Sequence, residues 1–248
     1  MRRPILGVVV LAAAALLAVA PADAARVIRD WPCAGCIIQV PSNPGTKRLP
    51  LLVALHGDEG DPALTASIWG PVADALHVVL FAPHCPVSQG CSFPNGAGTT
   101  SSWWGWLQSG SSYDDGWIGR QAAPVEQRFR IDRTREYLAG WSGGADFLGW
   151  YALRHADHFA GAAFVAGGVP YTSSCPSRRF PTFFLMGGAD FRYTSGQPEQ
   201  VRSLLVRCGS PTSEVVEPEA DHQTTITSLQ SGYARRVLTW LLRYRMRR

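Results

Sequence analysis

The sequence predicts an α/β fold with a mostly parallel central sheet and helices on both of its faces. Residues 51–55 form a continuous apolar run, which is typical of a strand buried on both sides. A second apolar strand, residues 137–139, passes through a glycine-rich turn into a segment with helical periodicity. A third strand, residues 182–186, ends in Gly-Gly-Ala-Asp, and a carboxylate at that point lies on the same edge of a parallel sheet as the glycine-rich turn.

The remaining elements follow in order along the chain. Residues 62–76 have helical periodicity, and residues 77–82 form the next apolar strand. A long polar, glycine-rich insertion covers residues 83–113. The pattern then predicts a helix over 115–129, a turn over 132–135 and a strand over 161–165. Towards the C-terminus it predicts a helix over 198–206, a strand over 213–216 and a final helix over 226–244. No internal repeat or linker divides the chain, so residues 25–248 are expected to form a single catalytic domain.

Residues 1–24 have the pattern of a signal peptide. Arg2 and Arg3 precede an apolar stretch over 5–20, and Ala22-Asp23-Ala24 supplies a small-x-small cleavage site. An uncleaved membrane anchor is the alternative, but the apolar run is short for a membrane span. We therefore expect a secreted or periplasmic protein that starts at Ala25, with no stable membrane insertion after cleavage. The formal charge of +4 falls to +3 without this segment, which is too small to argue for a nucleic-acid partner.

An even number of cysteines in an exported chain favours disulfides. Proximity in the sequence suggests the pairs Cys33–Cys36 and Cys85–Cys91, which leaves Cys175–Cys208. A redox-active Cys33–Cys36 pair or half of a zinc site are the alternatives. Neither has the surrounding pattern that it needs, since no second C-x-x-C follows and no βαβ unit encloses the pair.

The glycine-rich turn carries the strongest indication of chemistry. Gly140-Trp141-Ser142-Gly143-Gly144 is a G-x-S-x-G motif between a strand and a helix, which places a serine hydroxyl on a sharp turn. An incidental serine at a helix N-terminus is the structural alternative. Asp190 follows the predicted strand at 182–186, and His222 follows the last predicted strand, at 213–216. The order Ser142, Asp190, His222 predicts a nucleophile, an acid and a base. Asp146 should project away from His222, and Asp221 is too close in the chain to hold the ring of its neighbour.

These motifs resemble those of secreted α/β-hydrolases of the esterase group that includes polyhydroxybutyrate depolymerases, feruloyl esterases and carboxylesterases. The resemblance is carried by Leu55-His56-Gly57, the elbow at 140–144, Gly187-Gly188-Ala189-Asp190 and Asp221-His222. One departure is that this elbow has Trp141 and Gly143, where many such esterases have Leu and Ala. The resemblance implies an oxyanion hole formed by the backbone N–H groups of Asp58 and Gly143. It also implies that His56 is a structural residue beneath the loop.

The 83–113 insertion is rich in tryptophan and follows the C-terminal end of a strand, from which it can reach a cleft. Trp103 and Trp104 are candidates for substrate contacts, because indole faces stack on sugar rings or aromatic acyl groups. Trp141, within the elbow, is the third candidate. The alternative is that these side chains cover the edge of the sheet as core residues.

No cofactor or metal is expected, because hydrolysis through a serine needs none. Asp58, Glu59 and Asp61 form an acidic loop, and His155 and His158 lie one helical turn apart. Solvated surface positions explain both groups.

The predicted function is hydrolysis of carboxylic esters through an acyl-enzyme on Ser142, with a small or polymeric ester as the substrate. A serine peptidase is the first alternative, since the same triad cleaves amides. A non-catalytic protein that binds a glycan or polymer through its tryptophans is the second, and an intact triad argues against it.

Overall fold

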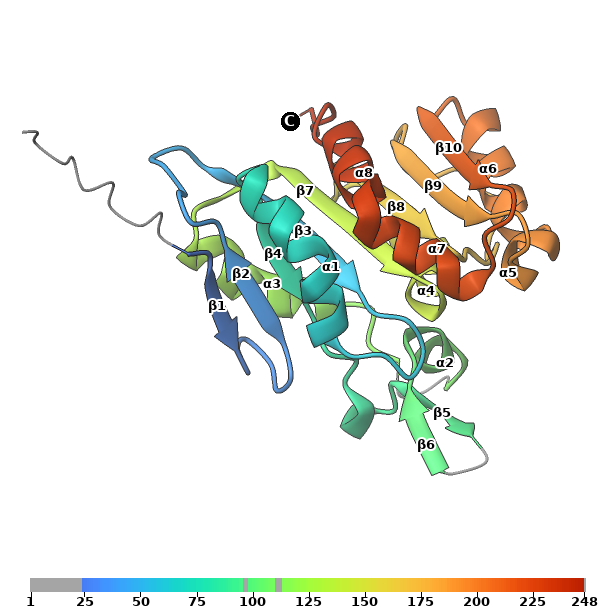
Figure 1. The fold of residues 1–248 in the computed structure, drawn as a ribbon, viewed down its shortest axis with the longest axis horizontal. Helices are drawn as coiled ribbons and strands as arrows, with labels where there is room; N and C mark the ends of the chain where they lie inside the picture. The colour runs from blue at the N-terminus through green and yellow to red at the C-terminus, as the bar shows by residue number, and fades with distance from the viewer. Residues whose placement is uncertain (1–23, 96–97, 110–112, 248) are drawn as a thin grey trace, which may run out of the picture.

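The computed structural model describes residues 24–95, 98–109 and 113–247. The predicted signal peptide therefore lies outside the described residues, apart from Ala24. The described part is built on one eight-stranded sheet in the order β1-β2-β4-β3-β7-β8-β9-β10 (Figure 1). The strands are β1 (Arg26–Arg29), β2 (Ile37–Val40), β3 (Leu49–Leu55), β4 (Val79–Ala82), β7 (Ile131–Trp141), β8 (Gly161–Val165), β9 (Thr182–Gly187) and β10 (Thr212–Glu217).

The six strands from β4 to β10 run parallel to one another, and only β1 and β2 pair antiparallel at one edge. The predicted mostly parallel α/β sheet is therefore confirmed. Strands β3, β8 and β9 are buried along their whole length and almost entirely apolar, because helices cover both of their faces.

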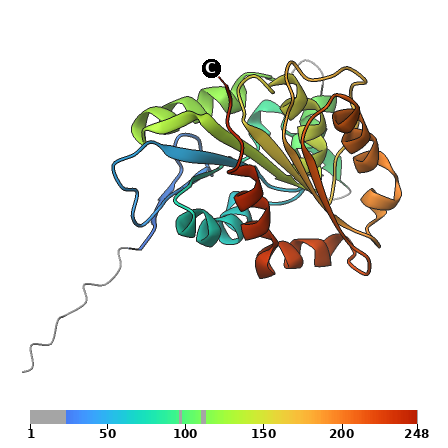
Figure 2. The ribbon, with the colours of Figure 1, turned by 90° about the horizontal axis from the view of Figure 1, so that it is seen from above.

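Helices cover the two faces of the sheet, as Figure 2 shows. On one face lie α1 (Pro62–Ala75), α7 (His222–Ser228), a π-helical segment (Leu229–Tyr233) and α8 (Ala234–Leu241). On the other lie α2 (Trp103–Gln108), α3 (Trp117–Arg128), α4 (Gly143–Arg154) and α6 (Gln197–Arg207). Each face has its own hydrophobic cluster, because successive side chains of a strand point to opposite sides: Leu51 and Val53 belong to one cluster, Leu52 and Ala54 to the other.

Two predicted elements were wrong. Residues 132–135, expected as a turn, form the first part of β7, where the pairing with β3 shifts register between Leu49 and Leu51. Their charged side chains are tolerated there because the strand end is only partly covered. The last helix is not continuous over 226–244: α7 already begins at His222, and Gly232 has a non-helical φ of 149° that separates it from α8.

The described part of the 83–113 insertion contains a short 3₁₀ helix (Val87–Gln89), a hairpin of β5 (Ser92–Asn95) and β6 (Gly98–Ser101), and α2. The three predicted disulfide pairs are present. Cys85–Cys91 fixes the insertion next to the end of β4, and Cys175–Cys208 ties the segment after β8 to the end of α6.

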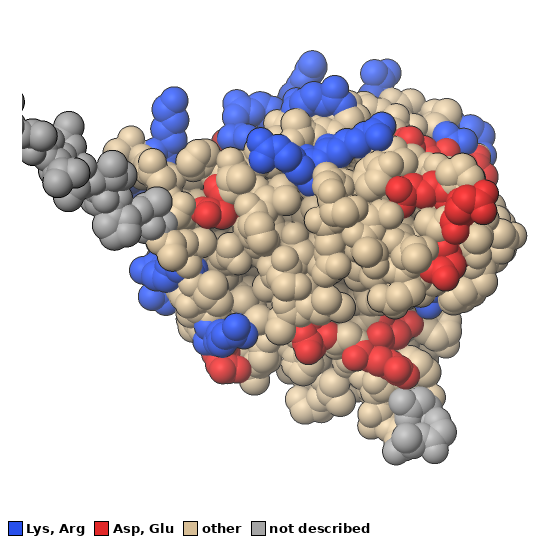
Figure 3. Space-filling model, viewed as in Figure 1, with Lys and Arg blue, Asp and Glu red and all other residues tan. Residues whose placement is uncertain are grey.

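The surface carries charges of both signs. Figure 3 shows Lys and Arg side chains gathered over the end of the molecule where α8 lies, and acidic side chains mainly elsewhere. Among the described residues, no helix has both the length and the apolar character needed to span a membrane.

Candidate active site

The elbow places Ser142 at the junction of β7 and α4 in a strained backbone conformation. Its φ of 54° and ψ of −123° are unusual for a residue with a Cβ, and such strain is found mainly where function requires it. The Ser142 amide donates to the carbonyl of Val165 on β8 at 2.9 Å, which fixes the turn to the sheet. Gly140 allows the close approach of strand and helix, because a Cβ there would lie 2.6 Å from the carbonyl of Gly144.

The loop after β9 brings Asp190 to the same edge of the sheet. The side chain is completely buried, and its two oxygens have separate partners. Oδ1 accepts from the amide of Arg192 at 2.8 Å, so that Asp190 caps the short helix α5 (Phe191–Thr194). Oδ2 faces Nδ1 of His222 at 2.9 Å. The capping bond holds the carboxylate so that its second oxygen points at the imidazole.

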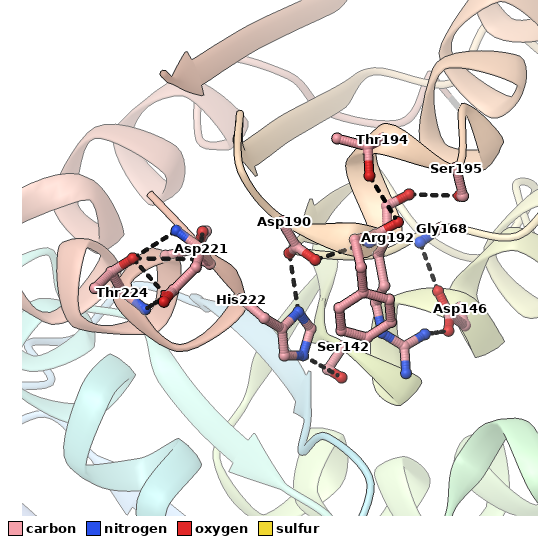
Figure 4. A network of polar contacts seen from close by, with 12 residues as sticks. Ser142, Asp146, Gly168, Asp190, Arg192, Thr194, Ser195, Asp221, His222 and Thr224 are labelled. Carbon is pink, nitrogen blue, oxygen red and sulfur yellow. Dashed lines mark hydrogen bonds and ion pairs between the residues drawn. The ribbon is translucent and has the colours of Figure 1, made fainter. Parts of the chain in front are cut away.

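His222 completes a continuous relay of hydrogen bonds (Figure 4). Its Nε2 lies 2.9 Å from the hydroxyl of Ser142, while Nδ1 faces Asp190. In the tautomer that this geometry favours, Nδ1–H donates to the carboxylate and Nε2 accepts from the serine. The ring of Trp141 stacks on the imidazole, with ring centroids 5.6 Å apart and an angle of 25° between the planes. Asp221 does not reach the ring; it caps α7 by accepting from the amide of Thr224.

The loop after β3 lies beside the start of α4. Gly143 is the first residue of that helix, so its amide has no partner within the helix. The amide of Asp58 donates no hydrogen bond to any other described residue. The two amides that the sequence predicts as oxyanion donors thus have no such partner, and the amide of Gly143 lies at the positive end of the α4 dipole.

His56 lies beneath this loop and is buried. Its Nε2 accepts from the amide of Cys85 at 3.2 Å, and its Nδ1 lies 2.7 Å from the carbonyl of Gly57. Burial lowers the pKa of His56 from 6.5 to about 4, so the ring is neutral at ordinary pH. A neutral ring with Nδ1–H donating satisfies both contacts, which is the geometry of a structural histidine.

The tryptophan predictions have different outcomes. Trp103 has no exposed surface and packs among the rings of His56, Trp106, Trp117 and Phe147, so a substrate contact is contradicted. It is buried because it is the first residue of α2, which packs against α4. Trp104, the next residue in the helix, is partly exposed. Trp141 is also partly exposed and contacts His222.

Two residues near the relay were not predicted from the sequence. Phe191 is 64% exposed, and its ring centroid lies 5.2 Å from that of His222. The guanidinium of Arg192 pairs with Asp146, which also accepts from the amide of Gly168 at 2.7 Å (Figure 4). An arginine two residues after a candidate acid has no sequence signature of its own, so only the fold shows this pair.

Other polar clusters lie away from this edge. His155 faces Asp115 at 3.1 Å, and His158 is exposed. Within the part of the chain that the structure describes, no three His, Cys, Asp or Glu side chains are placed to hold a metal ion.

Comparison with known proteins is informative only at the level of structure. No protein-family model and no curated protein matches the chain. Among solved structures, a ferulic acid esterase is similar with a TM-score of 0.65 and 17% identity, over 84% of this chain and 91% of that one. A carboxylesterase of Bacillus cereus is similar with a TM-score of 0.60 and 15% identity, over 83% and 92%. A fluorophosphonate-binding serine hydrolase of Staphylococcus aureus has a TM-score of 0.59 and 19% identity, over 84% and 91%. Together with the strand order and the elbow, these similarities show that the chain has the α/β-hydrolase fold.

Proposed function

We propose that this protein is an exported serine hydrolase that cleaves carboxylic esters through an acyl-enzyme on Ser142. The observation that carries the proposal is the relay from the Ser142 hydroxyl through His222 to the buried Asp190, with both distances at 2.9 Å. A serine on a strained elbow, a base within hydrogen-bond reach and an acid that orients the base are the parts required for nucleophilic catalysis.

The chemistry follows from this geometry. Nε2 of His222 takes the proton as Oγ of Ser142 attacks the ester carbonyl, and Asp190 stabilises the imidazolium that forms. The imidazolium then gives its proton to the departing alkoxide, and the acyl group stays on Ser142. A water molecule, deprotonated by the same nitrogen, attacks the acyl-enzyme and releases the acid.

The carbonyl oxygen becomes negatively charged in each tetrahedral intermediate. The amides of Asp58 and Gly143 are the proposed donors to it, supported by their position beside Ser142 and their lack of other partners. Such preorganised donors contribute because they need no reorganisation while charge develops.

Aromatic side chains around the relay are the proposed substrate contacts. Trp104 and Trp141 retain this role, and the exposed Phe191 joins them because its ring lies beside His222. An exposed aromatic ring next to a catalytic base suits an ester with an apolar group near the scissile bond. Export is supported by the three disulfides, which persist in oxidising compartments.

Burst kinetics on residues 25–248 tests the proposal. p-Nitrophenyl acetate and butyrate are mixed with the native protein, with Ser142→Ala and with Ser67→Ala, and the p-nitroanilide of the same acyl group tests amide cleavage. Ser67 is an exposed serine of α1 and serves as the matched control. Native protein and Ser67→Ala should release p-nitrophenol in a burst, and Ser142→Ala should lose at least about 10³-fold in rate while it keeps its fold.

An unchanged rate in folded Ser142→Ala would rule out the proposed nucleophile. The anilide is intrinsically far less reactive than the ester, so Ser142-dependent cleavage of the anilide at a rate that approaches the rate for the ester would replace the ester hydrolase by a peptidase-like amidase.

A further inference from the structure

Arg192 connects three parts of the site that come from distant parts of the chain. It follows Asp190 by two residues, and its guanidinium contacts the carboxylate of Asp146 on α4. The same group lies 3.5 Å from Oδ2 of Asp58 on the loop after β3. Figure 4 shows it between Ser142 and Asp146, and only 22% of the side chain is exposed. The cation is therefore held by two carboxylates, one on the helix that follows the proposed nucleophile and one on the loop after β3.

The carboxyl group of Asp58 lies against the first residue of α4. A Cβ added to Gly143 would overlap both oxygens of that carboxyl group, so no larger residue fits at 143 with Asp58 in place. The hydroxyl of Ser102, which caps α2, donates to Oδ1 of Asp58 at 2.6 Å. The proposed oxyanion donors are the amides of Asp58 and Gly143, so this side chain lies next to the place where negative charge would develop.

An ionised carboxylate at this place opposes catalysis. At an effective dielectric constant of about 20, a like charge within a few ångströms of the oxyanion would slow the chemical step by on the order of 100-fold. Burial raises the pKa of Asp58, whereas the hydrogen bond from Ser102 and the charge of Arg192 lower it. Glu59 on the same loop raises that pKa and His222 on α7 lowers it, each by a smaller contribution. Among these groups, only Arg192 and a protonated His222 are positively charged. Arg192 is therefore the cation that balances the negative charge of Asp58 when Asp58 is ionised.

We propose that Arg192 is a positioning residue that acts through Asp58: it compensates the Asp58 carboxylate so that an oxyanion can form at the amides of Asp58 and Gly143. The inference rests on the proposed serine hydrolase function. Asp146 supports it by holding the second side of the guanidinium, and the Gly168 amide in turn holds Asp146.

A mutant cycle separates this role from a merely structural one. Replacing Arg192 alone would leave the buried Asp146 carboxylate without a cation. The cycle is therefore made in an Asp146→Asn background, in which the side-chain oxygen at 146 still accepts from the amide of Gly168. Four proteins are compared. The first is the single variant Asp146→Asn, which is the background. The other three add to this background Arg192→Met, Asp58→Asn, or both of these changes. Asp58→Asn keeps the backbone amide and an acceptor for Ser102 while it removes the charge. Folding is checked by circular dichroism and thermal unfolding, and kcat and KM for p-nitrophenyl acetate are measured.

Arg192→Met should lower kcat by about 30-fold in this background and change KM by less than about 3-fold. Adding Asp58→Asn should bring kcat back to within about 5-fold of the background. Arg192→Lys in the native protein, which keeps a cation at the site, should lose no more than about 5-fold. If Arg192→Met does not fold, Arg192→Gln replaces it in the same cycle, with the same expected rescue.

The inference is overturned if the protein that carries both Arg192→Met and Asp58→Asn has a kcat equal to or lower than that of the protein with Arg192→Met, both in the Asp146→Asn background. The proposed function would still stand in that case. Absence of ester hydrolysis from the folded native protein overturns the proposed function and this inference with it.

Discussion

The buried histidine beneath the loop that carries Asp58 makes stability depend on pH in a defined window. Burial lowers the pKa of His56 from 6.5 to about 4, so the folded protein resists its protonation. Between these two values the unfolded chain binds more protons at this position than the folded one does. The free energy of unfolding therefore falls as pH falls through the window, and it is not affected further by His56 below the lower value.

The size of the effect follows from linkage. Going from about pH 7.5 to about pH 4.5, the shift removes on the order of 2–3 kcal/mol of stability. For a domain of this size that corresponds to a decrease of about 5–10 °C in Tm. The cause is local: the ring is buried, and protonation of Nε2 would turn the acceptor of the Cys85 amide into a donor.

Urea unfolding of the oxidised protein at several pH values measures this dependence. Carboxylates titrate in the same range, so the native protein is compared with His56→Gln, in which the side chain cannot be protonated. Over the window, the free energy of unfolding of the native protein should fall by on the order of 2–3 kcal/mol more than that of His56→Gln. His158→Gln, at a side chain that is 69% exposed, controls for the exchange itself and should follow the native curve. Parallel curves for native protein and His56→Gln would refute the assignment of His56 as a buried neutral ring.

Two further predictions concern the relay and the tryptophans. Asp190→Asn keeps an acceptor for the cap of α5, but it stabilises the wrong tautomer of His222. The kcat for p-nitrophenyl acetate should therefore fall by about 10⁴-fold, which is the loss known for the same exchange in a serine protease triad. Asp221→Asn, the matched control one residue from His222, should change kcat by less than about 3-fold, and an equal loss in both would contradict Asp190 as the acid. Trp103→Ala should cost about 3–5 kcal/mol in thermal or urea unfolding because the side chain is fully buried. Trp104→Ala should change KM and cost less than about 1 kcal/mol, and the opposite ranking of the two would overturn their assignment.

The sequence was sufficient to predict the parts of this protein that depend on local pattern. Apolar runs locate the central strands because a strand covered on both faces carries few polar side chains, and those need a hydrogen-bond partner. The G-x-S-x-G motif locates the elbow because strand and helix approach each other closely there. The order of Ser142, Asp190 and His222 could be predicted because each follows a strand of one parallel sheet, and parallel strands end at a common edge.

Local composition misled where tertiary contacts override it. The charges at 132–135 are typical of a turn, yet pairing with β3 extends the strand through them. Trp103 and Trp104 are adjacent in the same motif, and only the packing of α2 against α4 decides which ring is buried.

Only the tertiary structure brought Arg192, Asp58 and Asp146 together. They lie on α5, the loop after β3 and α4, and no spacing in the chain relates them. The sequence by itself determined the apolar strands, the elbow and which residues follow those strands at the edge of the sheet. The folded chain decided which charges at that edge compensate one another, because Coulomb energy depends on distance and burial rather than on order along the chain.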